Sequence, residues 1–128
     1  MSKCVLDASA ILAVLQNEPG SQVLTDEVLA ESVASAVNLA EVQTSMVRRG
    51  VPADEAWMRA SIPVSQVMAF TGDQARVAGS LVKQTRALGL SLGDRACLAL
   101  ALELNAPVYT ADRGWKKLRL NIPIHLIR

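Results

Sequence analysis

The segment Val5-Leu6-Asp7-Ala8-Ser9-Ala10 joins a short apolar run to residues that are typical of a helix. We expect a buried strand up to Leu6 and a helix over residues 8–15, which the Glu18-Pro19-Gly20 sequence ends. The same change, from a few continuous apolar residues to a helical pattern, recurs along the chain. Strands of this kind are typical of a sheet covered on both faces, so the pattern predicts an α/β domain.

Five predicted strands and the helices between them account for almost the whole chain. The further strands are expected at residues 32–35, 64–70, 108–109 and 122–127. The further helices are expected at residues 21–29, 36–49, 54–60, 71–88, 91–104 and 113–118. No repeat, linker or low-complexity segment is visible. We therefore expect residues 1–128 to form one domain with a central, mostly parallel five-stranded sheet flanked by helices.

Composition and charge limit the classes of function. The 13 Lys and Arg residues nearly balance the 12 Asp and Glu residues, which argues against a uniformly basic nucleic-acid coat. An aromatic content of 3% argues against a base-stacking sheet, although a nucleic-acid enzyme with a small local groove stays possible. The longest apolar run, residues 96–102, is too short to span a membrane. Cys4 and Cys97 have the sequence context of buried thiols, so we expect a cytoplasmic protein with no membrane partner.

Four acidic residues stand in apolar sequence, where an uncompensated carboxylate is costly: Asp7, Glu41, Asp94 and Asp112. Each of the three Asp residues could simply cap a helix. Glu41 could pair with a cation, although none stands three or four positions away. However, Asp7 and Asp112 fall at the carboxyl ends of predicted parallel strands, where open α/β sheets bind ligands. Asp94 opens a helix, and the helix with Glu41 follows a strand, so all four can face one edge.

Four carboxylates at one edge would repel one another strongly without a cation between them. The donor set consists of oxygen alone, which suits Mg²⁺ or Mn²⁺ and disfavours zinc. Such a site indicates metal-assisted phosphodiester hydrolysis, in which the metal activates water and stabilises charge on the phosphate. No histidine base is then needed, in agreement with the single His125. Ser9, Asn38 and Thr110 stand two or three positions from these acids and could support them, or could be ordinary cap and helix-face groups.

These motifs resemble those of the PIN-domain nucleases, and most closely those of the VapC-type toxins of bacterial toxin–antitoxin pairs. The resemblance rests on residues 5–10, 38–42, 90–99 and 110–113, in that order along the chain. It implies a three-layer PIN-like fold in which the four acids bind metal and catalyse, with Ser9 and Thr110 in support. It further implies an endoribonuclease that needs Mg²⁺ or Mn²⁺, a homodimer, and a VapB-like antitoxin that covers the site.

Arginines beside the motifs are candidates for contacts with the RNA substrate. They are Arg48, Arg49, Arg95 and Arg113. The last two could equally pair with neighbouring carboxylates. Trp57 suggests an apolar patch for a dimer or antitoxin contact, or ordinary packing between helices, whereas Trp115 is expected in the core.

Other functions stay open at this point. A PIN-domain nuclease could process RNA without any toxin role, and a catalytically idle PIN fold could serve protein binding. A receiver-like signalling domain would show adjacent acids near the first strand, and Asp7 has no acidic neighbour. A haloacid-type phosphatase would carry a second Asp two residues after Asp7, where this chain has Ser9.

Overall fold

The computed structural model describes residues 3–128, at whose centre five short strands form one sheet. The strands are β1 (Cys4–Leu6), β2 (Ser32–Ser35), β3 (Gln66–Met68), β4 (Val108–Thr110) and β5 (Ile124–Leu126). Their order is β3-β2-β1-β4-β5 and all neighbouring pairs are parallel, so the predicted α/β class with a parallel sheet is confirmed. Because the strand order reverses between β1 and β4, the carboxyl ends of these two strands mark the expected ligand crevice.

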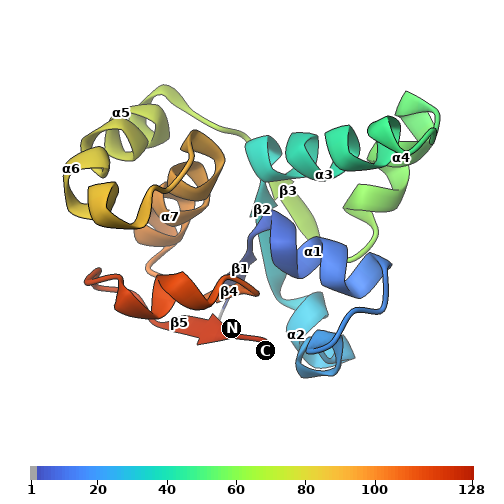
Figure 1. Cartoon of the computed structure of the whole chain (residues 1–128), viewed down its shortest axis with the longest axis horizontal. Coiled ribbons are helices and arrows are strands. Elements are labelled where there is room, and N and C mark those ends of the chain that lie inside the picture. Colours follow the sequence, from blue (N-terminus) through green and yellow to red (C-terminus); the bar gives the residue numbers. More distant parts are fainter. Residues whose placement is uncertain (1–2) are drawn as a thin grey trace.

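Helices cover both faces of the sheet (Figure 1). The α-helices are α1 (Ala8–Leu15), α2 (Asp26–Ala30), α3 (Ala36–Arg48), α4 (Ala53–Ser61), α5 (Gly72–Ser80), α6 (Val82–Thr85) and α7 (Leu92–Leu104). Three short 3₁₀ helices complete the set: η1 (Ser21–Val23), η2 (Arg86–Leu88) and η3 (Arg113–Lys117). Within residues 3–128, none of these helices is long and apolar enough to cross a membrane.

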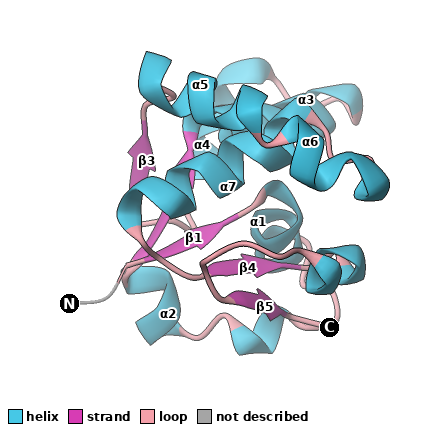
Figure 2. Cartoon of the chain, turned by 90° about the vertical axis from the view of Figure 1, so that its left-hand side faces the viewer, coloured by secondary structure: helices cyan, strands magenta, loops and turns pink. Residues whose placement is uncertain are grey.

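Two hydrophobic cores lie on opposite faces of the sheet, because successive strand residues point in opposite directions. Leu6 and Ala34 belong to the core that α1, α2, α3 and α4 complete. Val5 and Val33 belong to the second core, to which α7 contributes. This core also contains the fully buried Trp115. In Figure 2, β1 accordingly lies between α7 above it and α2 below it. The three-layer arrangement therefore follows from the burial of the inner strands β1 and β2 on both faces, whereas the edge strands β3 and β5 are partly exposed.

Two segments expected as single helices are divided. Residues 21–29 form η1 and α2, because the extended backbone of Thr25 interrupts the helix and its hydroxyl then caps α2. Residues 71–88 form α5, α6 and η2. Near the break, the hydroxyls of Ser80 and Thr85 donate to backbone carbonyls three and four residues earlier. Such bonds compete with regular helical bonding and favour short helical pieces.

Candidate active site

Asp7 follows β1 at the carboxyl end of the sheet and is only 4% exposed. Its Oδ1 accepts hydrogen bonds from Ser9 Oγ at 2.7 Å and from the Ala10 N–H at 2.8 Å. Its Oδ2 accepts from Thr110 Oγ1 at 2.5 Å. The bond from Ala10 is the N-cap of α1, so the capping role is real here. A carboxylate offers about four lone pairs, so these three bonds leave space for one further ligand.

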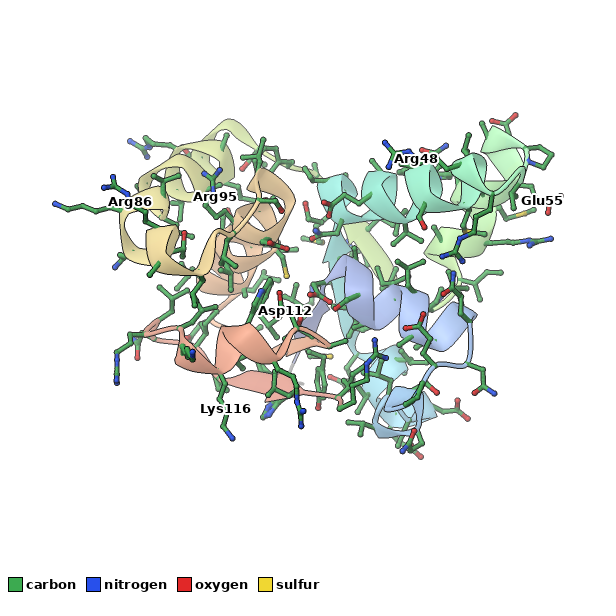
Figure 3. All side chains as sticks on the ribbon, in the orientation of Figure 1. Arg48, Glu55, Arg86, Arg95, Asp112 and Lys116 are labelled. Atoms are coloured by element: carbon green, nitrogen blue, oxygen red, sulfur yellow. The ribbon has the colours of Figure 1, made fainter. Side chains whose placement is uncertain are left out.

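A chain of hydrogen bonds connects Asp7 to Asp112. Thr110 ends β4 and is fully buried, and its Oγ1 donates to Asp7 while it accepts from the Asp112 N–H at 3.0 Å. Ser9 Oγ donates to Asp7 and accepts from the Ala111 N–H at 2.9 Å. Asp112 is exposed, and its Oδ1 caps η3. In Figure 3, Asp112 lies near the centre of the molecule, between the α5–α7 side and the α1–α4 side.

Asn38 ties Glu41 on α3 to the amino end of α7. The Asn38 side chain is buried, and its Nδ2 donates both to Glu41 Oε1 at 2.9 Å and to the Gly93 carbonyl at 3.0 Å. These two hydrogen bonds hold Glu41, which lies on the exposed face of α3, next to the first turn of α7. Among the described residues, Asn38 Oδ1 is a buried acceptor with no partner. Asn38 therefore orients Glu41 through one amide group that also fixes the spacing between two helices.

Gly93 is a site residue that sequence reasoning missed. A Cβ atom at this position would lie at 2.5 Å or less from every atom of the Glu41 carboxyl group. Only glycine leaves the space in which this carboxylate lies. The available signal was a glycine inside the first turn of a helix, where it costs about 0.5–1 kcal/mol relative to alanine and so needs a reason.

Asp94 is the third residue of α7 and forms a capping box with Ser91. Asp94 Oδ2 accepts from the Ser91 N–H at 3.0 Å, and Ser91 Oγ accepts from the Asp94 N–H at 3.1 Å. The capping role considered for Asp94 is therefore also real. It fixes the carboxylate at the amino end of α7, beside Gly93 and hence close to Glu41.

The carboxylates influence one another through their charges. Burial raises the pKa of Asp7 to about 6 against the lowering effect of its hydrogen bonds, and the negative charge of Asp94 raises it further. Partial burial also raises the pKa of Glu41, which Asn38 lowers and Asp94 raises. Burial raises the pKa of the Cys97 thiol, and the charges of Asp7, Asp94 and Glu41 add to this effect. These three carboxylates thus surround one buried region at the beginning of α7.

The candidate ligands are carboxylate oxygen atoms, which suit a hard divalent cation. Within residues 3–128, no three Asp, Glu, His or Cys side chains form a group that could enclose a metal ion as they stand. Mg²⁺ is commonly bound by one or two carboxylates and completed by waters and substrate phosphates, so a full protein cage is not required. Asp7 keeps a free lone pair, and the side chains that bond to it are the hydroxyls of Ser9 and Thr110. Asp7, Glu41, Asp94 and Asp112 remain the predicted ligands for Mg²⁺ or Mn²⁺.

The four candidate arginines differ in their surroundings. Arg95 is half-buried, and its Nη1 donates to the Ala78 carbonyl at 2.9 Å, which joins α7 to α5. Arg113 is exposed beside Asp112. A groove of about 630 Å³ runs along α3, and its lining includes Glu41, Arg48 and Arg49. Arg95 thus already has a structural partner, whereas the other three lie at the surface.

The fold and the carboxylates around the ends of β1 and β4 define an α/β protein with a candidate metal-dependent hydrolytic site. The model of the PIN domain matches residues 4–120, so the chain belongs to the PIN-domain family. No curated protein sequence matches the chain.

Solved structures of several bacterial proteins have a similar fold. VapBC2 from Rickettsia felis, bound to a promoter DNA fragment, has a TM-score of 0.71 and 20% identity over 94% of this chain and 96% of that chain. DNA-bound VapBC from Salmonella typhimurium has a TM-score of 0.74 and 16% identity over the full length of both chains. VapC20 from Mycobacterium tuberculosis, a Sarcin-Ricin loop cleaving toxin, has a TM-score of 0.74 and 19% identity over 89% of this chain and 93% of that chain. At these identities the likeness concerns the fold.

Proposed function

We propose that this protein is an endoribonuclease that hydrolyses RNA phosphodiester bonds and depends on Mg²⁺ or Mn²⁺. The observation that carries the proposal is Asp7, a buried carboxylate at the switch point of the sheet with its pKa raised to about 6. Hydrogen bonds connect it to Asp112, and the charge of Asp94 reaches both Asp7 and Glu41. Membership of the PIN-domain family and the likeness to VapC20, a toxin that cleaves RNA, support the same reaction.

The ion would be held by Asp7, Glu41, Asp94 and Asp112. When bound, it supplies a water of lowered pKa and positive charge beside the phosphate. Ser9 and Thr110 hold the Asp7 carboxylate in one orientation. Asn38 does the same for Glu41. Because these hydrogen bonds exist before an ion arrives, they reduce the reorganisation that binding requires.

Cleavage of a defined RNA by the purified protein is the direct test. We expect cleavage with Mg²⁺ or Mn²⁺ and none with EDTA. Asp7→Asn and Asp94→Asn should each lower kcat by at least about 100-fold, since even the loss of a group that orients a metal ligand costs roughly 10- to 100-fold. Asp26→Asn, an exposed acid in the first turn of α2, is the matched control and should keep full activity. Undiminished metal-dependent cleavage by both site variants would show that the four acids are not the active site.

We further propose that the protein is the toxin of a VapBC-type pair, acts in the cytoplasm and is inhibited by a VapB-like antitoxin. The similar structures of VapBC2 and of the Salmonella typhimurium VapBC support this role. The free, buried Cys4 and Cys97 support a reducing compartment. Expression of the wild-type chain should arrest growth, and expression of Asp7→Asn should not. Normal growth with soluble, active enzyme would contradict the toxin role.

A homodimer is the assembly that we propose for the free toxin. The α3–α4 hairpin exposes four apolar side chains to solvent: Val47, Trp57, Met58 and Ile62, with Ile62 71% exposed. Exposed apolar groups that gather on one hairpin are typical of an association surface. Light scattering should give twice the mass of the chain, and Ile62→Glu should shift the mass toward the monomer. A monomeric wild-type protein at micromolar concentration would contradict the dimer.

A further inference from the structure

The charges of the chain are divided unevenly along its length. Residues 72–128 carry nine Lys and Arg against four Asp and Glu, whereas residues 1–71 carry four against eight. The division is also spatial, because α5, α6, α7 and β5 lie on the left of Figure 1 and α1, α2, α3 and α4 lie to the right. We name the part formed by residues 72–128 the basic lobe. The near-zero net charge of the whole chain therefore results from one acidic part and one basic part.

Most cations of the basic lobe have no acidic partner. Arg76 pairs with Asp73 at 3.6 Å, and Arg128 pairs with Glu18 at 3.2 Å. Within residues 3–128, the remaining exposed cations of the lobe form no salt bridge: Lys83, Arg86, Arg113, Lys116, Lys117 and Arg119. Figure 3 shows Arg86 and Lys116 projecting away from the ribbon into solvent. These charges are available to an external anion.

The unpaired cations begin at the candidate active site. Asp112 directly precedes Arg113 at the start of η3, and the same short helix carries Lys116 and Lys117. The carboxylates alone would repel a polyanion, so a substrate phosphate needs a positive surface on at least one side of the site. The basic lobe supplies that surface, while the α1–α4 side carries an excess of acids.

We propose that RNA is held through its backbone phosphates by the basic lobe, and that it extends from the carboxylate site over η3 and the α6–η2 segment. This inference rests on the proposed function. Phosphate contacts are favoured over stacking, because the chain has only four aromatic residues and Trp115 is buried. The competing path follows the groove along α3, with Arg48 and Arg49, but this groove offers only two cations and lies in the part of the chain, residues 1–71, where acids outnumber bases.

Two double variants with equal loss of charge test the path. The first replaces Arg86 and Lys116 of the basic lobe by Gln, and the control replaces Lys3 and Arg59, which lie outside the candidate RNA contacts, by Gln. All four residues are exposed. Binding of a labelled single-stranded RNA is measured in EDTA over a NaCl series, and KM and kcat are measured with Mn²⁺. Each lost phosphate contact should flatten the slope of log K against log salt by about 0.7.

We expect the basic-lobe variant to bind RNA about tenfold more weakly, with a slope shallower by about 0.7 to 1.4. Its KM should rise by the same factor with kcat unchanged, and the control variant should match the wild type. Equal effects of the two variants, or a larger effect of the control, would overturn the inference about the RNA path. Cleavage of RNA by the wild type in the same experiment would still support the proposed function. Retained RNA binding together with lost binding of poly-glutamate would identify a protein-docking surface instead. A wild type that neither binds nor cleaves RNA would overturn both proposals.

Discussion

Replacement of Asp7 by Asn is expected to stabilise the metal-free protein at neutral pH. Burial raises the pKa of Asp7 from 3.8 to about 6 in the folded state. The folded state therefore holds the proton more tightly than the unfolded state. The contribution of Asp7 to the free energy of unfolding is highest below pH 4, falls as the pH rises toward 6, and is constant above it. A difference of about two pKa units corresponds to about 3 kcal/mol of lost stability at pH 7.

The Asn variant avoids this loss of stability, but a weakened hydrogen bond offsets part of its gain. Asn can still accept from Ser9 and from the Ala10 N–H, and it caps helices as well as Asp does. Its amide nitrogen faces Thr110 Oγ1 in place of an acceptor, so the hydroxyl must turn toward another partner. The hydrogen bond at risk is worth about 1 kcal/mol. We therefore expect Asp7→Asn to be more stable than the wild type by about 1 to 2 kcal/mol at pH 7.

Urea unfolding followed by circular dichroism in EDTA measures this difference. The difference should shrink as the pH falls and reverse to about 1 kcal/mol in favour of the wild type below pH 4, where only the lost hydrogen bond remains. Asp26→Asn is the control, and an exposed substitution of this kind should stay within about 0.5 kcal/mol of the wild type. Added Mg²⁺ should then stabilise the wild type and leave Asp7→Asn unchanged. If Asp7→Asn were less stable than the wild type at pH 7 in EDTA, the argument that burial dominates at this carboxylate would be wrong.

Four further substitutions probe the packing at the site and elsewhere in the fold. Gly93→Ala should displace the neighbouring Glu41 carboxylate and weaken Mn²⁺ binding at least about tenfold in a calorimetric titration. Gly79→Ala, in open space on α5, should instead raise the free energy of unfolding by about 0.5–1 kcal/mol. Thr110→Val should leave the Asp112 N–H unpaired, cost about 1–3 kcal/mol in urea unfolding, and raise the pKa of Asp7 measured by NMR. Trp115→Ala should cost about 3–5 kcal/mol, also measured in urea.

Opposite outcomes would identify which step of the reasoning is wrong. Unchanged Mn²⁺ affinity in Gly93→Ala would mean that Glu41 does not bind the ion from this position. A stable Thr110→Val variant would mean that the buried hydroxyl contributes little to the link between Asp7 and Asp112. A Trp115→Ala variant with nearly wild-type stability would contradict the central place of this side chain in its core.

The strand–helix alternation could be predicted because its signals are local. The apolar run before Asp7 and the helix cap that Asp7 itself forms are adjacent in the sequence, so the end of β1 and the start of α1 are readable from sequence. The division of residues 71–88 could not be read in this way. That break involves side chains such as Thr85, whose hydroxyl donates to a backbone carbonyl once the segment has packed against the core.

The residues of the candidate site could be named from sequence, but their contacts could not. A carboxylate in apolar sequence is a local signal, and it pointed to all four acids. The packing of Glu41 against Gly93 gives no such signal, because it depends on where α3 and α7 meet. Equally, nothing local shows that Arg95 bonds to the backbone of α5.

Apolar patterning and helix caps act over a few residues, and for this reason the amino-acid sequence was sufficient for the α/β class and the parallel sheet, and it supplied the four acids as candidate ligands. The connections among those residues span much greater distances along the chain. Thr110 and Asp7 are 103 positions apart, and Asn38 and Gly93 are 55 positions apart. They meet because the sheet places β4 beside β1 and because α3 packs near the start of α7. Only that folded arrangement places Thr110 beside Asp7 and Gly93 beside Glu41.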